Sequence, residues 1–490
     1  MTSSDDELYF LSARAQGELI RTRKISPVEL VGGYVDRIRR YDPVLRAYIT
    51  VCGEQALAAA RVAEREIAAG RYRGPLHGLP FGVKDQICTA GVRTTLGTRV
   101  ITGRSSDVDA AVIEKLKAAG AILIGKENLH ECGKGGTNVF PYGQPRNPWD
   151  PERTASSSSS GSGIAPAAGL CSASIGEDTG GSIRGPAAVN GVVGLRPTYG
   201  RVSRYGAVMY AWHSDTIGPV TRTVADNALL LSTIAGHDER DALSSARPVP
   251  DYLGALTGDL RGLRLAVVRE IARVDGVHPD VSEAFERSLE VLRSLGAEIG
   301  EVSLPWARHA IPLQMLTSDA DSASMYLDAL KTQWDVFDVG TRTRMATAML
   351  VPAPVYSRAM RARALVRGQV LAALKEWDAL ICPTHHKPPG LIDDTREKVE
   401  SKADVAERLI LRRIGTHTFG ASNVPTLALP MGFSREEAMP LSLQIAGRPF
   451  NEETVYRIGH AYEQATVWHT RHPDLDRTLA RFTGAAGKAR

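Results

Sequence analysis

The chain has 490 residues, and its 59 lysines and arginines against 55 aspartates and glutamates give a formal net charge of only +4. A balance this even, without a dominant basic stripe, is not typical of a nucleic-acid-binding surface, so we expect no nucleic-acid partner. The longest apolar stretches, such as residues 164–170, are far shorter than the roughly 20 residues of a membrane helix, so we expect no membrane contact.

The cysteines give no sign of a disulfide framework or of a zinc site. There are five of them, without any Cys-x-x-Cys spacing: Cys52, Cys88, Cys132, Cys171 and Cys382. An odd, scattered set is typical of a protein from a reducing compartment. The acidic start, residues 1–7, does not resemble a signal peptide. We therefore expect a cytoplasmic protein that needs neither a metal nor a cofactor.

The first 70 residues are predicted to be mainly helical. Ser26-Pro27-Val28-Glu29 has the form of a helix start, because the serine can cap, the proline suits the first helical position and the glutamate completes a capping box. Residues 56–69 form a second, alanine-rich helix that ends at Gly70.

The order helix, glycine, apolar strand occurs twice further along the chain, at residues 110–124 and 281–302. Three more segments have the composition of buried strands: residues 263–268, 424–430 and 441–446. A predicted helix follows them at residues 452–465. This alternation predicts packed α/β layers. Residues 305–415 are helical and more polar, which indicates an insertion or cap on one α/β body.

Residues 156–163, Ser-Ser-Ser-Ser-Ser-Gly-Ser-Gly, have the composition of a flexible linker. The sequence that follows argues against a linker, because residues 176–186 place a Gly-Gly-Ser turn between acidic residues and an arginine. The turn has neither the spacing of a phosphate-binding loop nor that of a nucleophile elbow. Upstream, residues 78–85 place Lys84 after an apolar run, a position where lysine is usually a surface residue.

These three blocks together resemble the amidase signature family. The family patterns are Gly-x-Pro-x-x-x-Lys-Asp, a Gly/Ser-rich block and Asp-Thr-Gly-Gly-Ser-Ile-Arg-x-Pro, which stands here at residues 178–186. Further similar blocks occur in the same order at residues 146–150, 191–203, 215–222 and 443–450, so the resemblance covers nearly the whole chain. It implies an α/β fold with a large mixed central β-sheet, helices on both faces and a helical insertion that caps the site.

On this basis we divide the chain into four segments that form one compact domain. Residues 1–70 are an N-terminal helical segment, and residues 71–260 are the amidase signature core. Residues 261–415 continue the α/β layers and contribute the cap, and residues 416–490 return to the core sheet.

The resemblance implies a catalytic triad of Ser182 as the nucleophile, Ser158 as a bridge after a cis peptide bond and Lys84 as the base. A serine hydroxyl is a poor nucleophile without a base within hydrogen-bonding reach, and lysine is a base only when it is neutral. We expect the apolar neighbours Val83 and Ile87, with no carboxylate close by, to favour the neutral lysine.

The resemblance further implies an oxyanion hole of four backbone N–H groups: those of Thr179, Gly180, Gly181 and Ser182. Asp178 and Arg184 are expected to form an ion pair that fixes this turn. Ser159 is interpreted as a hydrogen-bonding residue of the loop rather than as a second relay. Glycines are usual in the family where this chain has Ser156, Ser157 and Ser160, so the loop geometry is open to question.

Four residues are expected to line the substrate pocket: Cys132, Gly133, Thr137 and His213. Cys132 stands where an aromatic residue is common, so it either widens the pocket or makes it reactive, or is simply a small buried residue. The adjacent His385 and His386 are interpreted as part of a mobile loop and not as metal ligands.

The expected function is hydrolysis of the C–N bond of a small aryl or alkyl amide through an acyl-enzyme on Ser182. Carbamates, ureides and esters are alternative substrates. A further alternative is the amidase subunit of a glutamine-dependent tRNA amidotransferase, and another is a non-catalytic binding module. The expected partners are a small-molecule amide or carbamate and a second copy of the chain in a homodimer.

Overall fold

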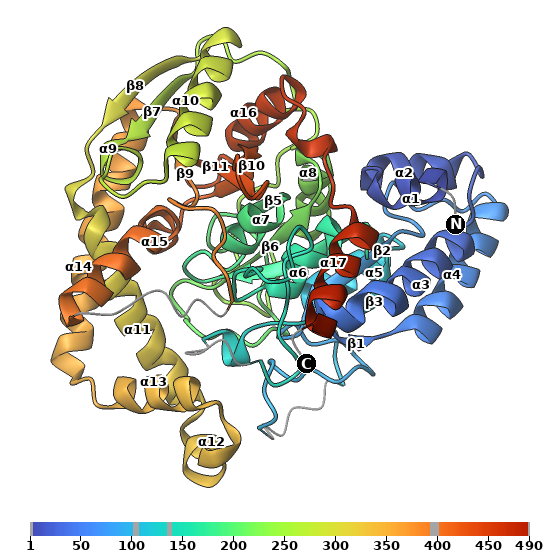
Figure 1. Cartoon of the computed structure of the whole chain (residues 1–490), viewed down its shortest axis with the longest axis horizontal. Coiled ribbons are helices and arrows are strands. Elements are labelled where there is room, and N and C mark those ends of the chain that lie inside the picture. The colour runs from blue at the N-terminus through green and yellow to red at the C-terminus, as the bar shows by residue number, and fades with distance from the viewer. Residues whose placement is uncertain (1–2, 101–106, 135–139, 393–400, 489–490) are drawn as a thin grey trace.

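The computed structural model describes residues 3–100, 107–134, 140–392 and 401–488, and the described strands form one mixed 11-stranded sheet. Their order across the sheet is β1-β3-β2-β4-β6-β5-β10-β11-β9-β7-β8 (Figure 1). The bounds are β1 Tyr48–Val51, β2 Pro80–Lys84, β3 Ile122–Glu127, β4 Ala173–Asp178, β5 Val193–Arg196, β6 Thr216–Thr221, β7 Arg264–Val268, β8 Glu298–Val302, β9 Ala379–Pro383, β10 Thr426–Phe433 and β11 Pro440–Gly447. Strands β3, β2 and β4 are parallel neighbours, as are β9, β7 and β8, and the other pairs are antiparallel.

Helices form the remaining layers. The α-helices are α1 Ser3–Phe10, α2 Ala13–Arg21, α3 Pro27–Leu45, α4 Gly53–Ala68, α5 Ala111–Ala118, α6 Ser160–Ala167, α7 Arg184–Asn190, α8 Val224–Ile234, α9 Arg269–Ala272, α10 Pro279–Ser294, α11 Ala310–Met325, α12 Leu327–Thr332, α13 Val339–Met349, α14 Ala353–Glu376, α15 Lys402–Ser422, α16 Glu452–Gln464 and α17 Leu475–Lys488. The short 3-10 helices are η1 Glu131–Gly133, η2 Pro305–His309, η3 Trp334–Val336 and η4 Trp468–Thr470.

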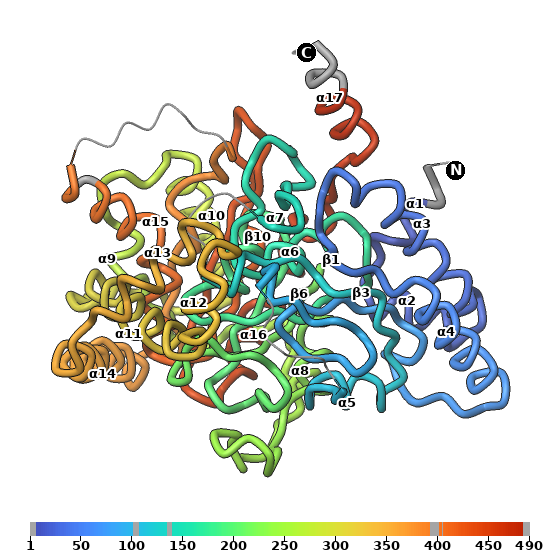
Figure 2. The backbone as a smooth tube through the Cα atoms, turned by 90° about the horizontal axis from the view of Figure 1, so that it is seen from below, coloured from blue at the N-terminus to red at the C-terminus, as the bar shows by residue number. Residues whose placement is uncertain are grey.

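Helices cover both faces of the sheet, as the resemblance implies. Figure 2 shows α6 and α7 on one side of the strands and α8 and α16 on the other. In β5, Gly194 faces α7, where an added Cβ would lie 2.6 Å from the Cβ of Ala187. Leu427 of β10 pairs with Leu195 and contacts Gly459 of α16 on the opposite face. Glycine at position 194 therefore lets α7 pack directly on the sheet beside the candidate site.

Most elements with a local sequence signal are confirmed. The predicted capping box at Ser26 is present, with Glu29 N–H donating to Ser26 Oγ at 3.1 Å and Ser26 N–H donating to Glu29 Oε2 at 2.8 Å. The argument against a flexible linker at residues 156–163 is confirmed, because residues 160–167 form the buried helix α6. By contrast, β1 interrupts the segment of residues 1–70 that was predicted to be mainly helical.

The predicted cap corresponds to η2 and α11–α14. Helix α11 packs against α13, α14 and α15, and Gln314 on α11 donates a hydrogen bond to the carbonyl of Thr179. A separate apolar cluster joins the cap to the core, with Tyr326 and Phe337 packing near Cys132 and Tyr210. The cap therefore touches the Gly-Gly-Ser turn directly.

All four predicted segments contribute strands to the same sheet. The boundaries at residues 70, 260 and 415 themselves remain predictions. Among the described residues, no helix combines the length and the apolar character that crossing a bilayer requires.

Candidate active site

Lys84 is the last residue of β2, the strand that lies between β3 and β4. Its side chain is fully buried, and Nζ donates a hydrogen bond to Ser158 Oγ at 2.9 Å. Ser158 is only 3% exposed and follows a cis peptide bond from Ser157, as the resemblance implies. The fold thus joins two residues 74 positions apart in the chain.

The expectation that no carboxylate lies near Lys84 is wrong. Glu177 of β4 places Oε2 at 2.8 Å from Lys84 Nζ, and neither side chain is exposed. The backbone carbonyl of Glu177 also accepts from Lys84 Nζ at 3.2 Å. Burial raises the pKa of Glu177 to about 7, against the lowering effect of the Lys84 charge. The two residues meet because β2 and β4 are parallel neighbours whose register pairs Val83 with Ile175, which brings Lys84 close to Glu177.

Ser182 is partly exposed, unlike Lys84 and Ser158. Its backbone carbonyl accepts a hydrogen bond from Ser159 N–H at 3.2 Å, which ties the turn to the serine-rich loop. Ser159 Oγ donates to the carbonyl of Glu177 at 3.0 Å, in keeping with the predicted role of Ser159 in holding the loop. Among the described contacts, the Ser182 hydroxyl makes no hydrogen bond to protein, so the place of Ser182 in the predicted triad remains a prediction.

The side chain of Asp178 binds the turn that is predicted to supply the oxyanion hole. Gly181 N–H donates to Asp178 Oδ1 at 2.7 Å, so this N–H group is already engaged within the protein. The N–H groups of Thr179, Gly180 and Ser182 are left as candidate donors. Gly181 has φ +131, and an added Cβ there would lie 2.6 Å from Thr416 of α15, so both the backbone conformation and the close packing of α15 require glycine.

The predicted ion pair between Asp178 and Arg184 is present. The guanidinium and the carboxylate are 3.0 Å apart, and both side chains are fully buried. Arg196 approaches the same carboxylate at 3.3 Å. Burial alone would raise the pKa of Asp178, but the two guanidiniums outweigh it and hold this pKa well below its ordinary value.

The three serines at usual glycine positions adopt different conformations. Ser156 has φ +61, in the left-handed region that favours glycine. Ser160 begins α6, and its Oγ donates to the carbonyl of Ser156 at 2.6 Å. Ser157 supplies the carbonyl side of the cis peptide bond to Ser158. The loop therefore accommodates all three serines.

Among the predicted pocket residues, Cys132 is fully buried in the apolar cluster beneath the cap. Burial raises the pKa of its thiol well above the ordinary value, which disfavours a reactive thiolate. Gly133 follows with φ +64 and packs against Tyr210, where a Cβ would lie 2.3 Å from the ring. Thr137 lies outside the described residues.

His213 lies in the loop before β6, next to Ser214, whose Oγ donates to the carbonyl of Thr179 at 3.0 Å. The Nδ1 atom of His213 is 2.9 Å from Asp321 Oδ2, and Nε2 is 3.1 Å from Thr317 Oγ1, both on α11. Burial lowers the pKa of His213 in spite of the Asp321 carboxylate. His213 therefore links the turn to the cap.

Sequence reasoning missed Glu177, Asp215 and Gln314 as residues around the turn. Thr179 Oγ1 lies 2.7 Å from Asp215 Oδ1 and 3.0 Å from Glu177 Oε1, so the two carboxylates meet at one hydroxyl. The available signal was that Glu177 and Asp215 are acidic residues within or beside otherwise apolar strand sequences.

The mobile-loop interpretation of His385 and His386 is not supported. His386 is 4% exposed, and its Nε2 lies 2.7 Å from the carbonyl oxygen of Ile271. Burial lowers the pKa of His385 to about 4. Burial lowers the pKa of His386 as well.

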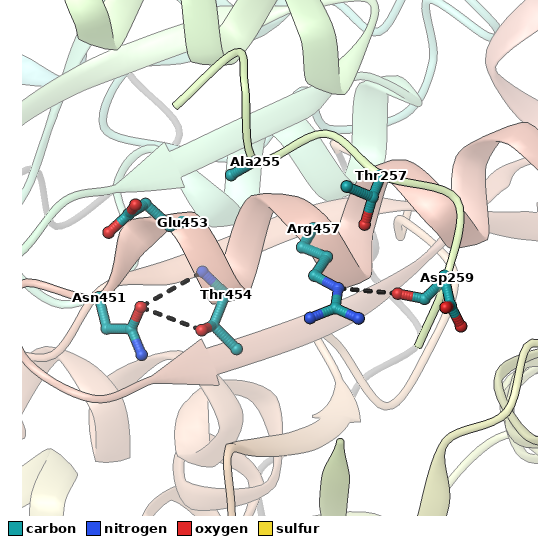
Figure 3. A pocket seen from close by; sticks show the side chains of 7 residues that line it. All are labelled: Ala255, Thr257, Asp259, Asn451, Glu453, Thr454 and Arg457. Atoms are coloured by element: carbon teal, nitrogen blue, oxygen red, sulfur yellow. Dashed lines mark hydrogen bonds between the residues drawn. The ribbon is translucent and has the colours of Figure 1, made fainter. Parts of the chain in front are cut away.

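Surface hollows occur away from this site. One of them has a volume of about 490 Å³. Arg457 of α16 donates to the carbonyl of Asp259 there at 2.7 Å, and Asn451 caps α16 by accepting from Thr454 N–H (Figure 3). A second hollow of about 540 Å³ lies over α3 and the start of α4. Neither is lined by a predicted site residue, so neither changes the location of the candidate site.

Comparison with known proteins agrees with the fold and the motifs. The family model described as Amidase matches residues 29–456. The chain is 40% identical over 495 residues to the A subunit of the glutamyl-tRNA(Gln) amidotransferase of Chloroflexus aggregans, and the match covers 96% of this chain and 99% of that relative. Two similar solved structures are the native peptide amidase of Stenotrophomonas maltophilia (TM-score 0.82, 30% identity, 93% of this chain and 96% of that one) and the glutamyl-tRNA(Gln) amidotransferase A subunit of Thermotoga maritima (TM-score 0.77, 30% identity, 95% and 97%).

These relatives contradict the expectation that the chain has no nucleic-acid partner, because several of them are by name subunits of an amidotransferase for glutamyl-tRNA(Gln). Net charge was an unsuitable criterion, since it averages over the whole surface of one chain and describes neither a local patch nor a multi-subunit assembly. The family match, the similar length and the shared fold lead to one conclusion: the chain belongs to the amidase family.

Proposed function

We propose that the chain hydrolyses a carboxamide through an acyl-enzyme on Ser182, with Lys84 as the base and Ser158 as the relay. The observation that carries this proposal is the buried hydrogen bond of 2.9 Å between Lys84 Nζ and Ser158 Oγ. The bond from Ser159 N–H to the Ser182 carbonyl holds the nucleophile's turn beside that pair, and the partial exposure of Ser182 gives a substrate access.

In this mechanism, Ser182 Oγ attacks the amide carbon while its proton passes to Ser158 Oγ and the Ser158 proton passes to Lys84 Nζ. Backbone N–H groups of Thr179, Gly180 and Ser182 donate to the oxyanion. When the C–N bond breaks, the proton returns through Ser158 to the leaving nitrogen. A water molecule then attacks the acyl-enzyme by the same relay and releases the acid.

We further propose that the amide is the side-chain carboxamide of glutamine and that the chain acts as the A subunit of an amidotransferase for glutamyl-tRNA(Gln). The support is the 40% identity to subunits of that name across 96% of this chain.

A second candidate is a partner-independent hydrolase of small aryl or alkyl amides, including carbamates, ureides or esters. The observation that favours it is the likeness to a peptide amidase, whose TM-score of 0.82 exceeds the 0.77 of the solved amidotransferase subunit.

The discriminating experiment measures ammonia release from glutamine and from a panel of aryl and alkyl amides, carbamates and esters. The chain is assayed alone and after co-expression with the other amidotransferase subunits of its own source. We expect glutamine hydrolysis that rises on assembly and supports amidation of glutamyl-tRNA(Gln). Turnover of aryl amides by the chain alone, without assembly and without glutamine hydrolysis, would favour the second candidate. The Ser182→Ala variant is the control, and full activity of this variant would exclude both mechanisms.

A further inference from the structure

We propose that Glu177 is a positioning residue that holds Lys84 in its charged form, so that the Lys84–Glu177 pair sets the pH above which the relay works. This inference rests on the proposed function, because it assumes that Lys84 is the base for Ser182.

The contacts of Lys84 are those of a charged ammonium group. Its Nζ lies within hydrogen-bonding distance of three acceptors: Ser158 Oγ at 2.9 Å, Glu177 Oε2 at 2.8 Å and the Glu177 carbonyl at 3.2 Å. A protonated lysine has three N–H donors, so these contacts use all of them. The relay requires the opposite state, a neutral nitrogen whose lone pair accepts the proton of Ser158.

Burial makes the Glu177 charge effective at this distance. Neither Lys84 nor Glu177 has any exposed side-chain surface, so solvent and salt screen the pair weakly. Burial by itself disfavours a charged lysine, whereas an opposite charge in contact favours it. Glu177 therefore counteracts the effect that would otherwise make Lys84 neutral, and removing its charge leaves burial unopposed.

Other charged and titratable groups face this pair from the neighbouring elements. They are Asp178 on β4, Asp215 before β6, Arg196 on β5, Tyr210 in the loop before Asp215, and Glu127, which stands beside Lys84 on β3. Asp215 and Glu177 share the hydroxyl of Thr179, which can donate to only one of them at a time. Burial raises the pKa of Glu177 and the charge of Lys84 lowers it, so the carboxylate and the ammonium group stabilise each other's charged forms. Lys84 must then lose its proton against that charge.

The experiment measures the rate at which a fluorophosphonate probe labels Ser182 between pH 5 and pH 10, with the modified residue identified by mass spectrometry. This readout reports activation of the nucleophile and does not depend on the substrate. For the wild-type chain we expect a labelling rate that rises with pH and has its midpoint above pH 7.

For Glu177→Gln we expect the midpoint to move down by at least one pH unit. At pH values below both midpoints, its labelling rate, divided by its own plateau rate, should then be about tenfold higher than the same ratio for the wild type. Glu177→Asp keeps the charge and is expected to stay close to the wild-type midpoint. Glu463→Gln is the matched control, because Glu463 is a buried glutamate on α16 that accepts a hydrogen bond from Val224 N–H and has no contact with Lys84 among the described contacts. Its midpoint should remain that of the wild type.

An unchanged midpoint in a folded Glu177→Gln variant overturns the inference, as does a loss of labelling at every pH, which would make Glu177 an obligatory proton acceptor. If Glu177→Gln does not fold, Glu177→Ser supplies a second neutral variant with the same expected shift. If neither folds, the wild-type midpoint decides, and a value below pH 7 overturns the inference. Failure of the proposed function is recognised separately, because Ser182 of the wild type would then remain unlabelled.

Discussion

The carboxylate of Asp178 lies 3.0 Å from the guanidinium of Arg184, with both side chains completely buried at the start of the Gly-Gly-Ser turn. The same carboxylate accepts from Gly181 N–H at 2.7 Å and from Ile183 N–H at 3.1 Å. The Asp178 carboxylate therefore holds the backbone of the turn through these hydrogen bonds. It also offsets the positive charge of two buried guanidiniums, those of Arg184 and Arg196.

The Asp178→Asn variant should be strongly destabilised. It removes the carboxylate that pairs with the buried Arg184 and also lies close to Arg196, and breaking such a buried pair costs about 3–5 kcal/mol in comparable sites. Since the pKa of Asp178 is lowered in the folded state, its contribution is complete above the unfolded-state value and is lost as the pH falls through the folded-state value. Urea titrations at several pH values, followed by tryptophan fluorescence, measure the difference from the wild type.

The control for this prediction is Glu18→Gln, which breaks the exposed ion pair between Glu18 and Arg21. It should leave the unfolding midpoint nearly unchanged. Equal midpoints for Asp178→Asn and the wild type at neutral pH would contradict the structural role assigned to Asp178.

Local signals were sufficient to predict part of the fold. The capping box at Ser26 depends on residues within one helical turn, and it is present as expected. The helix in the serine-rich block was harder to predict, because serine and glycine have low helix propensity. Residues 160–167 nevertheless form a helix that is buried on every side. Tertiary packing overrides the weak local preference there.

The site itself depends on contacts that no local pattern encodes. Lys84 and Glu177 are 93 residues apart, and they meet only because β2 and β4 lie side by side in parallel. The family motifs located Lys84, Ser158 and Ser182, but they carried no information about the glutamate that pairs with the lysine. A pairwise contact between two strands requires the sheet order, which hydrophobic periodicity does not determine.

Ser156→Gly should stabilise the protein slightly. Ser156 has φ +61, and a left-handed conformation costs a non-glycine residue roughly 1–2 kcal/mol, part of which glycine loses again through the greater freedom of the unfolded chain. We expect a net gain of up to about 1 kcal/mol. Ser160→Gly is the matched control, since it removes the hydrogen bond from Ser160 Oγ to the Ser156 carbonyl and weakens the start of α6.

Thermal unfolding of the two variants should therefore shift in opposite directions, with Ser156→Gly above and Ser160→Gly below the wild type. A decrease for both variants would mean that the serine hydroxyl at position 156 contributes more than the backbone conformation costs.

Cys132 should be inert toward thiol reagents in the folded protein. It is fully buried, and burial raises the pKa of its thiol, as it does for Cys171 and Cys382. Cys88 is partly exposed and should react first. Titration with Ellman's reagent should detect one fast thiol in native buffer and five in denaturant, with the fast site mapped by mass spectrometry. Fast modification of Cys132 would instead support a reactive pocket cysteine.

The pH dependence of stability should contain a contribution from Glu127. Burial raises the pKa of this carboxyl to about 8, although Ser174 Oγ donates to it at 2.5 Å. The folded state therefore holds a proton that the unfolded state releases above about pH 4.3, so stability falls as the pH rises between these values, by at most about 1.4 kcal/mol per unit. Glu127→Gln carries no titrating proton and preserves the shape of the side chain. We expect this variant to match or fall below the wild type near pH 5 and to exceed its stability at pH 8, as measured by urea titration. Parallel pH profiles for the two proteins would show that Glu127 is ionised in the folded state.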